Sequence, residues 1–169
     1  MTIFSIRMVS TVLLGLALAL GGCSSSDKKT SGVGDDYGDK MPGDMPLELN
    51  GDSDSNTAGG IKTIYFDFNS SQLSSETRSI LESNASFLKD NSGVEVEIEG
   101  HCDERGSVEY NLALGDRRAM AVKNYLSSLG VEVSRLSHTS YGKEKPVEYG
   151  HDEMAWQKNR RANFRVLSK

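Results

Sequence analysis

The chain has few cysteines and histidines, two residue types common in metal and catalytic centres. Its 169 residues include two cysteines and three histidines. These side chains are not at the spacing of zinc ligands, and no Cys/His or Ser/His/Asp set of catalytic roles can be assigned to them. The sequence therefore predicts no metal, no cofactor and no catalytic nucleophile.

The chain also lacks an excess of basic residues. Its formal net charge is −5, and residues 61–169 hold sixteen acidic and fifteen basic residues. A nucleic-acid-binding domain usually shows a basic patch or stripe. We therefore expect no nucleic-acid partner.

No apolar run is long enough to span a bilayer. The stretch Met8 to Leu20 has thirteen residues, whereas a spanning helix needs about 20. Arg7 precedes this stretch and small residues follow it, which is typical of a secretory signal in residues 1–22. Leu20 to Cys23 resembles a bacterial lipobox, which implies cleavage before Cys23 and lipidation of that cysteine. The alternative is an ordinary signal peptide with an incidental cysteine.

Residues 23–60 are expected to form the lipidated Cys23 and a disordered acidic tether. The segment is rich in Ser, Gly and Asp, has no sustained apolar period, and carries eight acidic residues against three lysines. As a flexible chain it would have an r.m.s. span of roughly 30 to 37 Å. With Cys23 lipidated, Cys102 is the only thiol, so no intrachain disulfide can form. We expect Cys102 to be buried as a small apolar residue.

Residues 61–169 have the usual size of one domain with its own core. Their pattern predicts strands at 62–68, 94–99, 136–141 and 163–167, a helix capped by Ser74 or Ser75, a helix ending at Leu129, and a short helix beginning at Asp152 or Glu153. Two βα units and two further strands predict an α+β fold of the βαβαββ type. In this sandwich the helices pack on one face of a mixed four-stranded sheet.

The most informative stretch runs from Val96 to Ala119. Apolar residues alternate with three glutamates over 94–99, which predicts a strand with one buried and one solvated face. Gly100 is expected to end it. Apolar residues recur at helical spacing from 110 to Gly130, which supplies a C-terminal stop. Residues 101–109 then connect strand to helix, where ligands commonly bind in α/β architectures.

Asp103 in this connection and Arg118 on the following helix carry complementary charges. An aspartate can accept from an ammonium group, and an arginine can hold a carboxylate with two parallel hydrogen bonds. Together they suit a zwitterionic ligand end. The alternative is a surface salt bridge with a helix-capping aspartate.

A set of separated motifs resembles the OmpA-like peptidoglycan-binding domain family, and most of all its branch of peptidoglycan-associated lipoproteins. The motifs are Gly100–Gly106, Glu109–Asn111, Leu114–Ala119 with Val122, Ser140–Pro146, Gly150–Glu153 and Lys158–Ala162. The resemblance covers about residues 61–169. Cys102 departs from the small residue, such as Ala or Thr, usual in the family, and Gly115 replaces a common Ser.

The resemblance implies the ligand and the residues that bind it. Asp103 and Arg118 would hold the meso-diaminopimelate of the peptidoglycan stem, which offers two amino and two carboxyl groups. Further binding residues would be Asp67, Phe66 and Arg160, supported by His101, Asn111, Asn159 and Arg161. Without the family, Asp67 could equally cap a turn, and the two adjacent arginines would be a solvated pair. Which of them contacts ligand stays open.

The resemblance also implies a binding protein rather than an enzyme. It would be anchored to the outer membrane through Cys23, face the periplasm, and hold the cell wall as part of the Tol–Pal system in cell division. Ser24 after the cysteine implies the outer-membrane destination. Partners would be peptidoglycan, TolB, other Tol proteins and outer-membrane proteins. The alternatives are a wall-anchoring lipoprotein without Tol partners, and a wall hydrolase using His101, Asp103 or Glu104.

Overall fold

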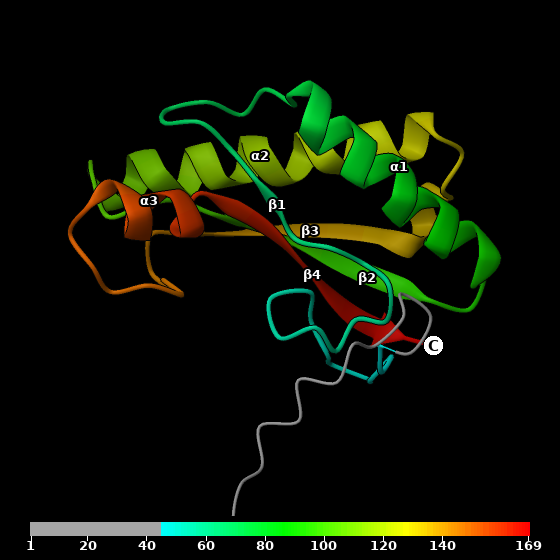
Figure 1. Cartoon of the computed structure of the whole chain (residues 1–169). Coiled ribbons are helices and arrows are strands. Elements are labelled where there is room, and N and C mark those ends of the chain that lie inside the picture. The colour runs from blue at the N-terminus through cyan, green and yellow to red at the C-terminus, as the bar shows by residue number, and fades with distance from the viewer. Residues whose placement is uncertain (1–44) are drawn as a thin grey trace, which may run out of the picture. The chain divides into compact units, whose positions relative to one another are not determined.

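The computed structural model describes residues 45–169, which form an α+β fold around one four-stranded sheet (Figure 1). In chain order the elements are β1 (Ile64–Tyr65), α1 (Ser75–Asp90), β2 (Glu95–His101), α2 (Val108–Ser128), the 3-10 helix η1 (Val133–Arg135), β3 (Leu136–Gly142), α3 (Glu153–Asn159) and β4 (Arg161–Ser168). The predicted signal peptide, Cys23 and the first part of the predicted tether lie outside the described residues. Within residues 45–169 no helix combines the length and apolarity that a bilayer crossing requires.

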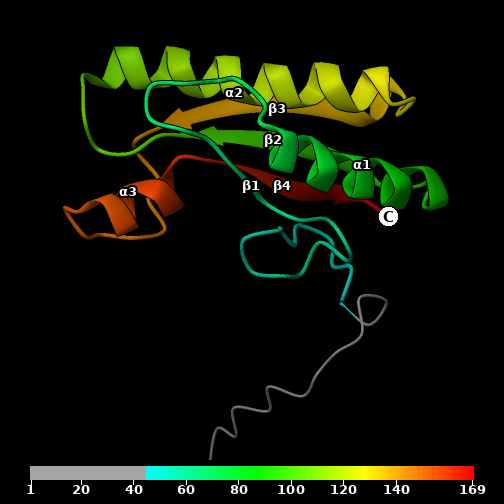
Figure 2. The ribbon, with the colours of Figure 1, turned by 45° about the horizontal axis from the view of Figure 1, so that its top comes forward.

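The strand order of the sheet is β1-β4-β2-β3. Strand β4 runs antiparallel to both β1 and β2, and β3 runs parallel to β2. Helices α1 and α2 lie on the same side of this sheet (Figures 1 and 2). The predicted mixed four-stranded sheet with helices on one face is therefore confirmed.

The helices begin and pack largely as their sequences predict. Ser74 caps α1, because its side chain accepts a hydrogen bond from the backbone N–H of Thr77. The inner face of α1 buries Leu81, Ala85 and Leu88 against the sheet. Helix α2 begins at Val108 behind a Ser107 cap, so the connection from β2 is shorter than the predicted 101–109.

Gly100 does not end strand β2 as expected, because β2 continues to His101. Its function is steric. A Cβ at position 100 would lie 2.0 Å from the carbonyl oxygen of Gly115 on α2. The missing side chain therefore allows the middle of α2 to lie directly against β2, which places Arg118 one helical turn further along the same face.

The second face of β2 is solvated as predicted only at its start, where Glu95 is exposed and Glu97 half-buried. Glu99 and His101, further along the same face, are both buried, because side chains of β4 and β3 cover them. The Nδ2 group of Asn163 donates to the Glu99 carboxylate at 2.9 Å, and the His101 ring stacks on Tyr141 with centroids 5.6 Å apart. Strand alternation identified the apolar face correctly but could not show that the polar face is covered at the end of the strand.

Residues 46–60, which we call the strap, belong to the fold and not to a disordered tether as expected. The strap forms backbone hydrogen bonds with β4, from Asn50 to Val166 at 2.9 Å and from Ser53 to Phe164 at 3.0 Å. Strand β1 pairs only with the first two residues of β4, so the strap completes the edge that β1 leaves open. Asp54 adds an ion pair with the buried Arg161 at 2.7 Å.

We expect Gly100→Ala to destabilise the fold by about 1 to 3 kcal/mol, because the added methyl group must separate α2 from β2. Denaturant unfolding of the full chain measures this change. Gly93→Ala is the matched control, since its Cβ would meet its nearest neighbour at an ordinary 3.5 Å. Equal unfolding free energies for the two variants would contradict the close helix–strand approach.

Candidate functional site

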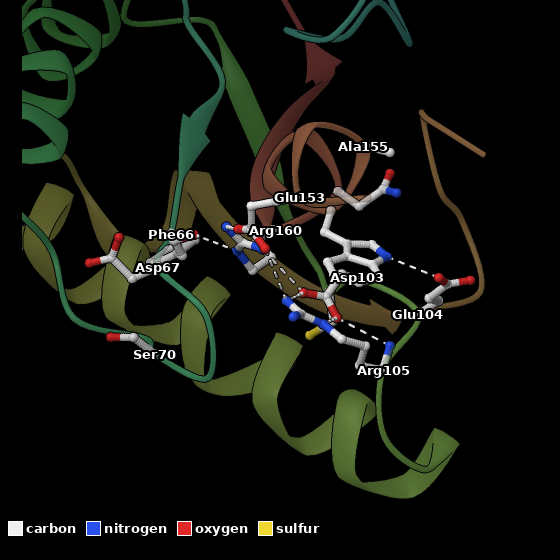
Figure 3. Close-up of polar contacts among 12 residues, drawn as sticks. Phe66, Asp67, Ser70, Asp103, Glu104, Arg105, Glu153, Ala155 and Arg160 are labelled. Atoms are coloured by element: carbon white, nitrogen blue, oxygen red, sulfur yellow. Dashed lines mark hydrogen bonds and ion pairs between the residues drawn. The ribbon is translucent and has the colours of Figure 1, made fainter. Parts of the chain in front are cut away.

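The carboxylate of Asp103 lies at the centre of the candidate site, two residues beyond the end of β2. It is buried, with an exposed fraction of 4%. Its Oδ1 accepts from the backbone N–H and the Nε of Arg105, both at 3.1 Å. Its Oδ2 accepts from Arg105 Nη2 at 2.6 Å and from Arg160 Nη1 at 3.3 Å (Figure 3). Burial alone would raise the pKa of Asp103, but the hydrogen bonds from Arg105 hold it below its usual value.

Arg105 is held by aromatic rings as well as by the Asp103 carboxylate. Its guanidinium carbon lies 4.0 Å from the ring centroid of Phe68 and 4.0 Å from that of Trp156. Trp156 is oriented in turn by Glu104, which accepts from the indole N–H at 2.9 Å. The cation is therefore placed between two aromatic faces, where it is attracted by both.

Arg160 immediately precedes β4 and approaches Asp103 from the opposite side. Its Nε donates to the carbonyl of Phe66 at 3.1 Å, and its Nη2 donates to Glu153 at 2.6 Å (Figure 3). With its contact to Asp103, the buried guanidinium joins the segment after β1, the loop after β2 and helix α3.

Arg118 on α2 is completely buried, with an exposed fraction of 0%. It donates to three backbone carbonyls, those of Ser70 at 2.8 Å, His101 at 2.7 Å and Asp67 at 3.0 Å. A fourth contact joins Nη1 to the Cys102 sulfur at 3.4 Å. Burial lowers the pKa of Arg118. Because a guanidinium has five N–H donors, one Nη2 hydrogen remains without a partner among the described residues. With these contacts in place, Arg118 cannot donate the predicted pair of hydrogen bonds to a ligand carboxylate.

These charged groups border a cavity of about 190 Å³ between the end of β2 and the start of α2. Asp103 and three arginines line it together with apolar and amide side chains. The lining residues are Phe68, Asn69, Cys102, Asp103, Arg105, Gly106, Tyr110, Asn111, Leu114, Arg118 and Arg160. The cavity thus combines one acceptor with several cationic donors, which suits a small ligand end that carries both charges.

Two of the expected binding residues face elsewhere. Phe66 lies beneath Arg118, with its ring centroid 5.0 Å from the guanidinium carbon. The Asp67 carboxylate points away from Asp103 (Figure 3). Both residues line a separate cavity of about 430 Å³, and the Arg160 side chain lies between the two cavities. Asp67 contributes to the first site through its backbone carbonyl, which Arg118 holds.

The expected supporting residues have different surroundings. Asn111 braces the loop by donating to the carbonyls of Arg105 and Ser107. Asn159 holds the loop before α3 through the backbone groups of residues 147 and 148. His101 and Arg161 instead face the strap side of the sheet, and the structure places only Arg160 of the arginine pair at the Asp103 cavity.

Several residues of the site were not predicted individually. Arg105, Phe68, Tyr110 and Glu153 contact the cavity or the charged groups around it. Arg105 belongs to the motif Gly100–Gly106, but an arginine two residues after an aspartate gives no sign of which way its side chain points. The aromatic pattern at 62–68 predicts only a strand for Phe68, whereas β1 ends at Tyr65 and Phe68 lies in the segment beyond it.

The geometry does not assemble a paired acid and base. Asp103 is engaged by four donors, and Glu104 is occupied by Trp156 and His151. Burial lowers the pKa of His101, which lies on the other face of the sheet. Among residues 45–169 no three His, Cys, Asp or Glu side chains are grouped as a metal site would require. Cys102 is a buried free thiol, as predicted.

Comparison with known proteins identifies the family. The model of the OmpA family matches residues 65–160. The peptidoglycan-associated lipoprotein of Pasteurella multocida is 41% identical over 158 residues, which cover 92% of this chain and 97% of that protein. The protein of the same name from Pseudomonas aeruginosa is 44% identical over 157 residues, covering 90% and 93%.

Solved structures agree with the fold. The crystal structure of the peptidoglycan-associated lipoprotein from Burkholderia pseudomallei matches with a TM-score of 0.60 at 45% identity, covering 62% of this chain and 88% of that one. The C-terminal domain of Helicobacter pylori MotB matches with a TM-score of 0.58 at 23% identity, covering 62% and 83%, and so shares the fold. The chain therefore belongs to the peptidoglycan-associated lipoproteins, within the OmpA family.

Proposed function

We propose that the protein binds peptidoglycan non-covalently through the meso-diaminopimelate of the peptide stem. The observation that carries this proposal is the buried Asp103 carboxylate in a cavity lined by three guanidinium groups. The Asp103 carboxylate accepts hydrogen bonds from the ammonium group of the ligand, and the guanidinium groups attract the ligand's carboxylate. Relatives named peptidoglycan-associated lipoprotein support the choice of ligand.

The size of the cavity supports recognition of one residue of the stem. A volume of about 190 Å³ is below the range of roughly 300 to 1,000 Å³ typical of pockets for drug-sized ligands. It accommodates an amino-acid end, while the sugar strand stays outside. Phe68 and Tyr110, both exposed at the cavity, provide apolar contact for the aliphatic part of diaminopimelate.

Arg118 contributes mainly by fixing the cavity wall. Its three carbonyl contacts join the segment after β1 to the end of β2. Its charge and its remaining Nη2 hydrogen attract the ligand carboxylate from within the protein. Asp67 and Phe66 act through their backbone carbonyls. The Asp67 carbonyl accepts from Arg118, and the Phe66 carbonyl accepts from Arg160.

Lipidation of Cys23 would anchor the protein to the outer membrane, with the domain in the periplasm. Several acyl chains make such an anchor effectively stable. The Asp103 cavity would then bind the cell wall while the lipid anchors the protein in the membrane. Many copies together would add avidity. We further infer that the protein works in the Tol–Pal system in cell division and envelope integrity, with TolB and other Tol or outer-membrane proteins as partners.

Asp103→Asn should reduce binding of the full chain to diaminopimelate-type peptidoglycan by about tenfold or more. The variant keeps the shape of the side chain but removes its charge, and a hydrogen bond to a charged group is worth about 1.5 to 3 kcal/mol. Co-sedimentation with purified sacculi in detergent measures the loss. Asp90→Asn, at the exposed end of α1, is the matched control. Undiminished binding by folded Asp103→Asn would refute the assignment of this site.

Arg118→Met should lower the unfolding free energy by at least about 2 kcal/mol, because three carbonyl groups lose a buried donor. Arg117→Met is the control, since Arg117 is exposed on the same helix and should change stability by less than about 0.5 kcal/mol. Thermal and denaturant unfolding compare the two. Similar stabilities would show that the Arg118 contacts do not hold the site together.

Capture by TolB tests the proposed partnership. If TolB and the wall use overlapping surfaces, soluble diaminopimelate-containing muropeptides should reduce the amount of protein that immobilised TolB retains. Asp103→Asn should make that retention insensitive to muropeptide. If wild-type protein is not retained by TolB while it still binds sacculi, the protein anchors the wall without this partner.

A further inference from the structure

The acceptor capacity of Asp103 is already filled by the protein's own donors. A carboxylate offers about four lone-pair sites, and Asp103 receives one backbone and three guanidinium N–H groups. A ligand ammonium group therefore finds no vacant acceptor on this carboxylate. One of the internal donors must leave when such a ligand binds.

Arg105 is the donor that can leave. The Arg160 side chain is only 6% exposed and is fixed by Phe66 and Glu153 as well as by Asp103. The Arg105 side chain is 31% exposed, and its hydrogen bonds are all to Asp103. It contributes two of the four donors through its guanidinium, so its departure opens both carboxylate oxygens.

The structure also provides a second position for the Arg105 guanidinium. Glu153 Oε2 lies 3.8 Å from Arg105 Nη2, and its side chain is 63% exposed. The rings of Phe68 and Trp156 flank the guanidinium and provide flat surfaces along which it can slide. A small movement therefore transfers the cation from Asp103 towards the cavity rim without exposing it fully to water.

We propose that Arg105 is an internal substitute for the ligand's ammonium group and thereby determines the specificity of the site. This inference rests on the proposed function. A ligand with an ammonium group alone only exchanges one cation for another on Asp103, which gains little. A ligand that also carries a neighbouring carboxylate pairs that group with the displaced Arg105 and forms a new ion pair. Arg105 thus converts a simple cation site into a site for a zwitterionic α-amino acid end.

Two stem tetrapeptides that differ by one carboxylate test this role. One contains meso-diaminopimelate and the other contains lysine, which has the same chain and terminal amine without the carboxylate. Trp156 is the only tryptophan of the chain and stacks on Arg105, so its fluorescence reports displacement of the guanidinium. We would titrate both peptides into the full chain in detergent, as wild type, Arg105→Gln and Arg105→Lys, with calorimetry measuring each affinity and Trp156 fluorescence reporting the displacement in wild type.

Wild type should prefer the diaminopimelate peptide. Arg105→Gln should bind the lysine peptide about tenfold more tightly than wild type does, because the internal competitor is gone, and its preference for diaminopimelate should shrink by at least that factor. Arg105→Lys should fall between them, since one ammonium cannot fork onto both oxygens. Arg78→Gln, an exposed substitution on α1 with the same change of charge, should behave as wild type.

The outcomes separate this inference from the proposed function. If Arg105→Gln binds the lysine peptide no more tightly, or weakens for both peptides equally, Arg105 is an ordinary ligand contact and the inference is overturned. That result leaves the peptidoglycan proposal intact as long as wild type binds the diaminopimelate peptide and Asp103→Asn does not. If neither peptide binds wild type or Arg105→Gln, both proposals fail.

Discussion

The burial of one full positive charge, that of Arg118, constrains the rest of the site. A guanidinium with no solvent contact is tolerated only when its N–H groups find acceptors, since an isolated buried ion costs far more than a protein's net stability. Arg118 obtains them from the carbonyls of Asp67, Ser70 and His101. The segment after β1 and the end of β2 therefore cannot move independently. The cavity is organised before any ligand arrives, which favours precise recognition.

Around this fixed wall, positive groups outnumber negative ones. Arg105, Arg118 and Arg160 line the cavity, and Asp103 is the one carboxylate among its lining residues. The strap strengthens the same region, because Asp54 pairs with Arg161 next to Arg160 at the start of β4. A segment that is remote in sequence thus helps to fix the β4 backbone where it carries a charged residue of the site. The excess of positive charge favours a ligand that brings a carboxylate together with its ammonium group.

The sequence predicted the parts of this structure that depend on local periodicity and local chemistry. The Ser74 cap, the apolar face of α1 and the strand-to-helix connection around Asp103 all follow from short patterns. The strap did not, because it is held mainly by backbone and polar side-chain contacts, and its few apolar contacts, such as Ala58 and Leu47, form no sustained period. Nor could residue spacing show that Arg118 donates to backbone carbonyls or that Arg105 donates to the Asp103 carboxylate. The Arg118 contacts depend on where the distant segment after β1 lies, and the Arg105 contact depends on side-chain directions within one loop, neither of which residue spacing determines.

The two departures from the family pattern, Cys102 and Gly115, are explained by the same contact between α2 and the sheet. A Cβ at Gly115 would lie 2.3 Å from the hydroxyl oxygen of Ser140, and that hydroxyl donates to the carbonyl of Leu112 at 2.7 Å. Ser140 thus fills the space and makes the helix contact that a serine at position 115 could otherwise provide. Cys102 lies just after β2 in a confined position against α2, with its sulfur 3.4 Å from both Arg118 Nη1 and the Asn111 carbonyl. A small polarisable side chain fits there without displacing Arg118, so both departures preserve the geometry on which the buried charge depends.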